Sequence, residues 1–351
     1  MATPKSETAT PKRNFWPWFK LALGAAVVTY VLKSKLIDFQ SLKEVALAPT
    51  TALMSLTFLT FSTVVCCFRW YLLTRAQGLQ ASFRGMLELS MIGSFFNLFM
   101  PGSVGGDLIK GWYIAKEQPQ KRARAVFTVL FDRGIGLAVF FFFAAVTLLL
   151  FKDLLVGKPA LQALAAPIWG VSSALVVGAV FFFSPLWDLK PIQGMLKFFH
   201  KLGPLGKLID AADAYRGQLP TVIYALALSF LSVTVNVLFY YWLGMQLEIN
   251  ATLSQFFFLV PVGVTASAVP VLPGGIGVAQ VAFFKLFQWT GIPNPEGGAT
   301  LCTINQIYNV LFGCFGSIFY FKYRHKLPAN PEVSSPDAVV ESHSPLARTI
   351  R

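Results

Sequence analysis

Six long apolar runs constrain the fold of this chain more than any other feature. Each run is long enough to cross a hydrocarbon core of about 30 Å, which takes about 20 helical residues. Charged residues make up 13% of the chain, about half the share of a soluble domain, and the mean hydropathy is +0.60. The sequence therefore predicts an all-α polytopic membrane protein with six transmembrane helices near residues 15–32, 50–73, 125–151, 163–183, 220–243 and 299–321.

Two Pro-Gly breaks interrupt apolar sequence, one in each half of the chain. The first covers residues 101–107 (PGSVGGD) and the second residues 273–277 (PGGIG). Pro and Gly end helices and free backbone polar groups, which are tolerated at membrane depth only where they are buried in protein or line a cavity. Because each break has an apolar stretch on either side, we predict two re-entrant helical hairpins. Broken segments at matching places in two halves are typical of a transporter's substrate site.

The basic residues predict the orientation, because Lys and Arg concentrate in cytoplasmic loops. If the N-terminus is inside and each hairpin returns to the face it left, most Lys and Arg residues are cytoplasmic, and the exceptions are Lys33, Lys35, Lys43, Lys152, Lys158 and Lys285. Both termini are then cytoplasmic. Three spans separate the hairpins, so the hairpins oppose each other in an inverted repeat, with halves at about 15–151 and 163–321. The net charge of +13 fits an anionic membrane surface, and no nucleic-acid partner is predicted.

The remaining segments complete the predicted organisation. Residues 1–14 read as a basic cytoplasmic tail, 15–326 as one transmembrane domain and 327–351, rich in Pro and Ser, as a disordered cytoplasmic tail. Residues 189–215 mix apolar and basic side chains and predict an interfacial helical segment broken at Gly203-Pro204. We expect buried apolar thiols, with no metal site or cofactor, at the four cysteines, which are Cys66, Cys67, Cys302 and Cys314.

Charged side chains near the first break form a candidate site. Asp107 ends the break and can cap the helix that follows, and Asp132 and Arg133 lie inside the third predicted span. A charge at membrane depth costs a few kcal/mol or more unless it pairs or lines a wet cavity. We therefore predict that Asp107 pairs with Arg133, with Lys110 beside them. The simpler interpretations are a helix cap for Asp107 and an interfacial anchor for Arg133.

The helices that begin at the two breaks supply the rest of the candidate site. Their first N–H groups and their dipoles attract anions such as phosphate. The predicted binding residues therefore include Gly105, Gly106, Gly274, Gly275 and Gln280. Supporting roles are predicted for Pro101, Asp132, Pro273, Arg69 and Asn97, the last as a partner for freed carbonyls, and interhelical hydrogen bonds for Asn236, Asn305 and Asn309. Close helix packing at the glycines is the alternative.

In this order and spacing the motifs resemble one known family. The runs from Asn97 to Asp107 with Lys110, from Asp132 to Leu137 and from Pro270 to Gly277 look like the lysylphosphatidylglycerol synthase transmembrane family, also called flippase-like, and so does an Arg at position 69. The resemblance covers roughly residues 15–325. It implies a protein of a bacterial-type inner membrane that moves lipids between leaflets. The chain departs from the family at two positions, with Lys110 in place of Arg and Gln280 in place of an acidic residue. The second departure removes a possible proton carrier and so argues against proton coupling.

The predicted function is translocation of a lipid whose phosphate headgroup binds between the hairpins. The lipid is an anionic phospholipid or a polyprenyl-phosphate carrier, and Arg133 and Lys110 hold its phosphate. The resemblance implies no enzymatic role, because the synthetase domain of two-domain members has no counterpart after Lys326. It implies a separate lipid-modifying enzyme as a partner. No Walker-type loop is present to drive ATP hydrolysis. The alternatives are a membrane glycosyltransferase or its accessory subunit, and a small-anion transporter.

Overall fold

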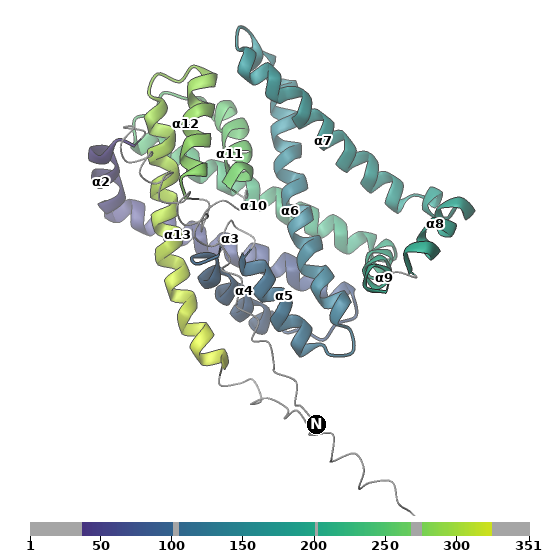
Figure 1. Cartoon of the computed structure of the whole chain (residues 1–351). Coiled ribbons are helices and arrows are strands. Elements are labelled where there is room, and N and C mark those ends of the chain that lie inside the picture. The colour runs from purple at the N-terminus through teal and green to yellow at the C-terminus, as the bar shows by residue number, and fades with distance from the viewer. Residues whose placement is uncertain (1–36, 101–104, 201–202, 268–275, 325–351) are drawn as a thin grey trace, which may run out of the picture.

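Long helices form the frame of the protein (Figure 1). The computed structural model describes residues 37–100, 105–200, 203–267 and 276–324, and these residues fold into helices and short connections. Five of the helices in these ranges are long and apolar enough to cross a membrane, and they match the second to sixth predicted spans. The predicted first span and both predicted tails lie outside the described residues. The five helices are α3 (Pro49–Ala76), α6 (Arg122–Leu150), α7 (Pro159–Phe183), α10 (Leu219–Gln246) and α13 (Pro295–Arg324).

Two pairs of shorter helices flank the Pro-Gly breaks. The first helix of each pair has 15 residues and the second has 13. A 15-residue helix is about 22 Å long, which is less than the hydrocarbon thickness. Within each pair the two helices pack on each other, as predicted for the arms of a hairpin. The pairs are α4 (Phe83–Asn97) with α5 (Gly105–Glu117), and α11 (Leu253–Ser267) with α12 (Val278–Thr290). Pro101, Pro273, Gly274 and Gly275 lie outside the described residues.

The four-helix order of α3 to α6 returns in α10 to α13. The first set has lengths of 28, 15, 13 and 29 residues, and the second has 28, 15, 13 and 30. Packing between the sets is reciprocal: α3 packs on α10, α4 packs on α13 and α11 packs on α6. Each short pair therefore contacts the closing long helix of the opposite set.

The remaining elements lie at the edges of this frame. The helix α2 (Phe39–Leu47) is capped by the Asp38 carboxylate and packs on α13. Two helices follow α7 where an interrupted interfacial segment was predicted, α8 (Lys190–His200) and α9 (Pro204–Arg216). Gly203 precedes α9 and has a φ of +62°. This backbone conformation favours glycine over other residues. The Tyr215 hydroxyl of α9 donates a 3.0 Å hydrogen bond to the Leu73 carbonyl, which ties this segment to α3.

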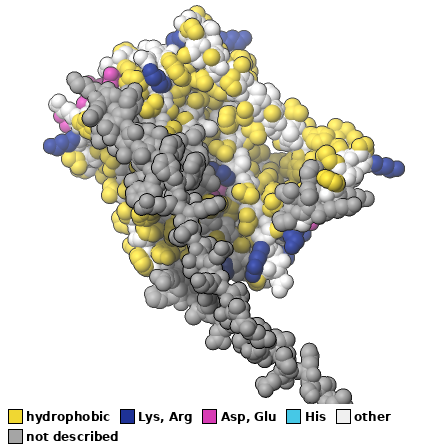
Figure 2. All heavy atoms as spheres, in the orientation of Figure 1, with side chains coloured by type: hydrophobic (Ala, Val, Ile, Leu, Met, Phe, Trp, Pro, Cys, Tyr) yellow, Lys and Arg dark blue, Asp and Glu magenta, His cyan; other side chains and the backbone are white. Residues whose placement is uncertain are grey.

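Apolar side chains fill the interior and also cover much of the outside. The largest buried cluster joins α10, α11, α12 and α13 to the other long helices, with Phe258 and Phe287 fully buried. Hydrophobic side chains dominate the face in Figure 2, as expected for a surface in contact with lipid tails. Cys67 and Cys302 are buried as predicted, but Cys314 is exposed. The expected burial of Cys314 is wrong, because a residue inside a span faces lipid as readily as protein.

Candidate functional site

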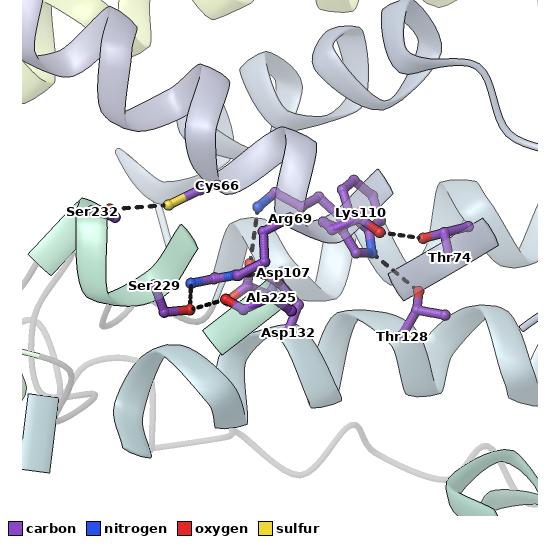
Figure 3. Close-up of polar contacts among 11 residues, drawn as sticks. Cys66, Arg69, Thr74, Asp107, Lys110, Thr128, Asp132, Ala225, Ser229 and Ser232 are labelled. Atoms are coloured by element: carbon purple, nitrogen blue, oxygen red, sulfur yellow. Dashed lines mark hydrogen bonds and ion pairs between the residues drawn. The ribbon is translucent and has the colours of Figure 1, made fainter. Parts of the chain in front are cut away.

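Charged side chains from three helices, α3, α5 and α6, meet inside the bundle and form an ion cluster, seen in part in Figure 3. Its ion pairs join α3 to α6 and α5 to α6. Three cations and two carboxylates leave one positive charge without a counter-charge in the cluster. The members are Arg69, Asp107, Lys110, Asp132 and Arg133.

The strongest pair in the cluster is a bridge between Arg69 and Asp132. Arg69 Nε and Nη2 donate to Asp132 Oδ1 and Oδ2 at 2.7 and 3.0 Å, the bidentate geometry of a guanidinium on a carboxylate. Arg69 Nη1 donates to Ser229 Oγ at 2.8 Å, and the Ser229 hydroxyl donates to the Ala225 carbonyl at 2.8 Å. The Arg69 side chain is buried and ties α3, α6 and α10 together. Only a supporting role was predicted for Arg69. The signal that could have identified the pair is the presence of opposite charges inside two predicted spans, Arg69 in the second and Asp132 in the third.

Asp107 holds the other two cations. Its Oδ1 accepts a 3.2 Å hydrogen bond from Lys110 Nζ, and Arg133 Nη1 lies 3.8 Å from its Oδ2. The buried Oδ2 accepts no hydrogen bond from the described residues, since 3.8 Å is beyond hydrogen-bond distance. Arg133 keeps 35% of its side chain exposed, and Lys110 keeps 22%. The structure thus brings together Asp107 and the two cations predicted beside it, and Arg133 has the more exposed side chain of the two.

The start of α5 is positioned by Asn97 and by a close approach of two backbones. Asp107 lies within the first turn of α5. A capping residue would instead precede the helix, so Asp107 is not the N-cap. The Gly106 N–H donates to Asn97 Oδ1 at 2.6 Å. Asn97 therefore satisfies a freed amide, because the first N–H groups of a helix have no intrahelical acceptor. The carbonyls of residues 101–104, its predicted partners, lie outside the described residues. A Cβ on Gly106 would collide with the Gly93 carbonyl of α4. Packing, the alternative interpretation of the glycines, therefore applies at Gly106.

Gln280 has a corresponding place at the start of α12. Its Oε1 accepts a 2.6 Å hydrogen bond from the Gly277 N–H. Its Nε2 donates to Gln306 Oε1 of α13 at 2.6 Å and lies 3.3 Å from Thr303 Oγ1. The Gln280 side chain is buried, so it links the second break to α13 within the protein.

Two adjoining cavities connect the ion cluster to the space between the helix pairs. The arginine cavity has a volume of about 260 Å³, and Arg69 and Arg133 line it together with residues of α3, α6, α10 and α11. The amide cavity has a volume of about 340 Å³ and is lined from both pairs and from α3, α10 and α13. They share Ser62, Asn236 and Val264. In the described part of the chain no three acidic, His or Cys side chains lie close enough to hold a metal ion.

Asparagines of α10 and α13 line the amide cavity. Asn305 Nδ2 donates to the Tyr240 hydroxyl at 2.7 Å, which is the predicted kind of interhelical bond. Asn309 Nδ2 donates to the Asn305 carbonyl of its own helix at 2.8 Å. Asn236 Oδ1 is buried and accepts no hydrogen bond from the described residues. The polar side chains that line the amide cavity are therefore uncharged.

Comparisons with known proteins find a matching family model and similar membrane proteins. The family model described as lysylphosphatidylglycerol synthase TM region matches residues 18–316. A UPF0104 membrane protein of Methanothermobacter thermautotrophicus is 22% identical over 261 residues, which are 66% of this chain and 74% of the relative. A UPF0104 membrane protein of Pyrococcus horikoshii is 23% identical over 268 residues, 68% of this chain and 77% of the relative. No solved structure matches the chain.

Proposed function

The chain belongs to the lysylphosphatidylglycerol synthase transmembrane-region family, and from this premise we propose that it is a membrane lipid translocase. Its substrate is a lipid with an anionic phosphate headgroup, either a phospholipid or a polyprenyl-phosphate carrier. The family model describes a transmembrane region, which fits a protein that moves lipid and does not modify it chemically. Such a translocase would move lipids made by a separate lipid-modifying enzyme, which is therefore the proposed partner.

The observation that carries this proposal is the excess positive charge of the ion cluster beside the arginine cavity. An uncompensated charge at membrane depth is costly, so the cluster favours an anion that neutralises it. Arg69 is fully engaged by Asp132 and Ser229. Arg133 lines the cavity, is partly exposed and has only a loose contact with Asp107. Its planar fork of N–H donors matches a phosphate group, with Lys110 as a second cation and Asp107 holding both in place.

The route for the headgroup rests on the arrangement of the two helix pairs. We place them in the membrane as opposed re-entrant hairpins related by an inverted repeat. Matching helix lengths and reciprocal packing support this placement. Three long helices, α6, α7 and α10, separate the pairs, and an odd number of crossings puts the pairs on opposite faces. Both termini are then cytoplasmic, in a bacterial-type inner membrane.

A small soluble anion is the second candidate substrate. Cavities of about 260 and 340 Å³ accommodate such an anion without acyl chains. A glycosyltransferase has less support, because both carboxylates of the cluster are already bound to cations.

Reconstitution tests the translocase proposal. Purified protein in liposomes with a reporter lipid in one leaflet should exchange an anionic lipid faster than protein-free vesicles do. Arg133→Gln should abolish the acceleration, whereas Arg84→Gln should preserve it, because Arg84 is 82% exposed and lies outside the cavities. Exchange no faster than in protein-free vesicles for any anionic lipid would refute the translocase. Acceleration that survives Arg133→Gln would refute the site.

Labelling tests the topology. In a variant without the four native cysteines, Gly102→Cys and Gly274→Cys should react with a membrane-impermeant reagent from opposite faces. Reaction of both from one face would rule out opposed hairpins.

A further inference from the structure

A third cavity, here called the basic cavity, lies between the connection from α5 to α6 and the helix α9. Its described lining consists of residues 119–124 together with Lys207 and Asp210 of α9, and its volume is about 430 Å³. The helix α9 packs on α6 (Figure 1). None of these lining residues also lines the arginine cavity or the amide cavity. The basic cavity is therefore separate from the proposed route of the translocated lipid.

The charges around the basic cavity are strongly unbalanced. Four cations and one carboxylate line it, namely Lys121, Arg122, Arg124, Lys207 and Asp210. Lys121 Nζ donates a 2.9 Å hydrogen bond to the Gly78 carbonyl, a neutral acceptor that leaves its charge uncompensated. Arg122, Arg124 and Lys207 form no ion pair with another described residue. Three positive charges are thus in excess, and a cleft lined by one sign of charge attracts ions of the opposite sign.

Three of the four cations lie at the start of α6, where the helix dipole favours an acidic residue instead. Lys121 is the N-cap residue, the first turn contains no acidic residue, and no described side chain caps the helix. The first N–H groups of a helix have no intrahelical acceptor and are good donors to an anion. The preference of Lys and Arg for cytoplasmic loops accounts for basic residues on this face but not for their grouping around one helix start. The arrangement therefore favours a bound anion.

The basic cavity lies at the level that lipid headgroups occupy. The apolar part of α6 begins at Ala125, so residues 121–124 mark the end of its membrane-spanning segment. The neighbouring helix α8 packs on α9 and exposes Met195 and Phe198. Exposed apolar side chains beside basic ones are typical of a helix that lies in the membrane interface. A lipid headgroup is therefore the anion that has the most direct access to this cavity.

We infer that the basic cavity binds a lipid with a terminal phosphate group, at a site distinct from the translocation cavities. A terminal phosphate has three free oxygens and carries about two negative charges at pH 7, whereas the phosphodiester of a common phospholipid has a single charge. The phosphate accepts hydrogen bonds from the first N–H groups of α6 and from Arg122 and Lys207 on the two walls. The bound lipid stabilises the contact between α6 and α9 and the connection from α5 to α6, the helices that carry Asp107 and Arg133.

Hydrogen exchange at the start of α6 tests the inference on the full chain in phosphatidylcholine nanodiscs. One sample contains phosphatidic acid, and the other contains an equal amount of phosphatidylmethanol with the same acyl chains. Phosphatidic acid should slow the exchange of the amides of residues 122–124 about tenfold relative to phosphatidylmethanol, as expected of one charge-assisted hydrogen bond. Equal exchange rates in the two samples would overturn the inference. The readout is local, so lipid bound in the arginine cavity does not produce it.

Variants assign the protection to the basic cavity. Arg122→Gln and Lys207→Gln each remove an exposed cation from one wall, and each should remove most of the protection given by phosphatidic acid. The matched control Arg84→Gln changes a side chain that is 82% exposed and outside the cavity, and it should retain the protection. Protection that survives both cavity variants would overturn the assignment. The comparison of the two lipids on the unmodified chain does not depend on the folding of any variant.

A soluble phosphate tests the source of the ligand. Glycerol 3-phosphate carries the same terminal phosphate without acyl chains. Added to nanodiscs of phosphatidylcholine alone, in the amount used for phosphatidic acid, it should leave the exchange rates unchanged. Protection equal to that by phosphatidic acid would overturn a lipid as the ligand. The inference does not depend on the translocase proposal, because the absence of lipid exchange between leaflets would leave this site standing.

Discussion

Removal of the Asp132 carboxylate tests whether the bridge to Arg69 holds three long helices together. Asp132→Leu leaves the Arg69 guanidinium, 8% exposed in the native bridge, with Ser229 as its remaining hydrogen-bond partner. Loss of one partner of a buried ion pair costs about 3–5 kcal/mol, because the other charge stays buried without compensation. Asp132 itself is 17% exposed, which admits some solvent, so we expect a loss near the lower end of that range. Arg69→Met combined with Asp132→Leu should recover most of it, because apolar replacement of both partners is often neutral or stabilising.

Chemical unfolding of the purified protein in detergent, followed by tryptophan fluorescence, measures these losses. The control is Arg84→Met, which removes an exposed partner of Glu88 on one helix and should cost no more than about 0.5 kcal/mol. The double variant also keeps the single excess positive charge of the ion cluster and should therefore retain lipid exchange. The reasoning fails if Asp132→Leu costs less than about 1 kcal/mol, or if the double variant is as unstable as the single one.

Two further predictions concern the starts of α5 and α12. Gly106→Ala should lower the free energy of unfolding by about 1–3 kcal/mol, because its Cβ collides with the Gly93 carbonyl. Gly111→Ala on the same helix, where the nearest atom is Val126 Cγ1 at 4.0 Å, should not destabilise the protein, and equal losses would contradict the clash. Gln280→Leu should cost about 1–3 kcal/mol, because the Gly277 N–H loses its acceptor. Its control is Gln288→Leu, at an exposed position of α12, and equal thermal stability of the two variants would exclude the role of Gln280.

Local sequence was sufficient to predict the long helices, but it did not predict α2. Long apolar runs gave α3, α6, α7, α10 and α13, because a membrane span depends on length and composition alone. The Pro-Gly breaks predicted where α4 and α11 end and where α5 and α12 begin, because adjacent Pro and Gly residues disfavour a helix. A single proline is accommodated within α7 (Pro167) and within α11 (Pro261). Burial within a span depends on the neighbours of each face, and Cys314 shows why composition alone does not predict it.

The candidate site was only partly predictable. Charges at membrane depth tend to form pairs, and on this basis Asp107, Lys110 and Arg133 were predicted to lie together. Asp107 and Lys110 are also one turn apart on the same helix. It did not give the bridge between Arg69 and Asp132, which are 63 positions apart, because that contact depends on how α3 packs against α6. The cavities were also beyond prediction, since their walls come from helices in both halves of the chain.

The reciprocal packing of α4 on α13 and of α11 on α6 has a consequence for biogenesis. The face of α4 that finally contacts α13 is synthesised roughly 200 residues before that partner, which at ribosomal rates means a delay of about 10–40 s. During this delay α4 lies in or near the translocon before its partner helix α13 has been synthesised. Insertase or chaperone contacts that shield α4 would therefore be needed until the last helix is made. Truncations that remove α13 should expose the first helix pair to membrane proteases.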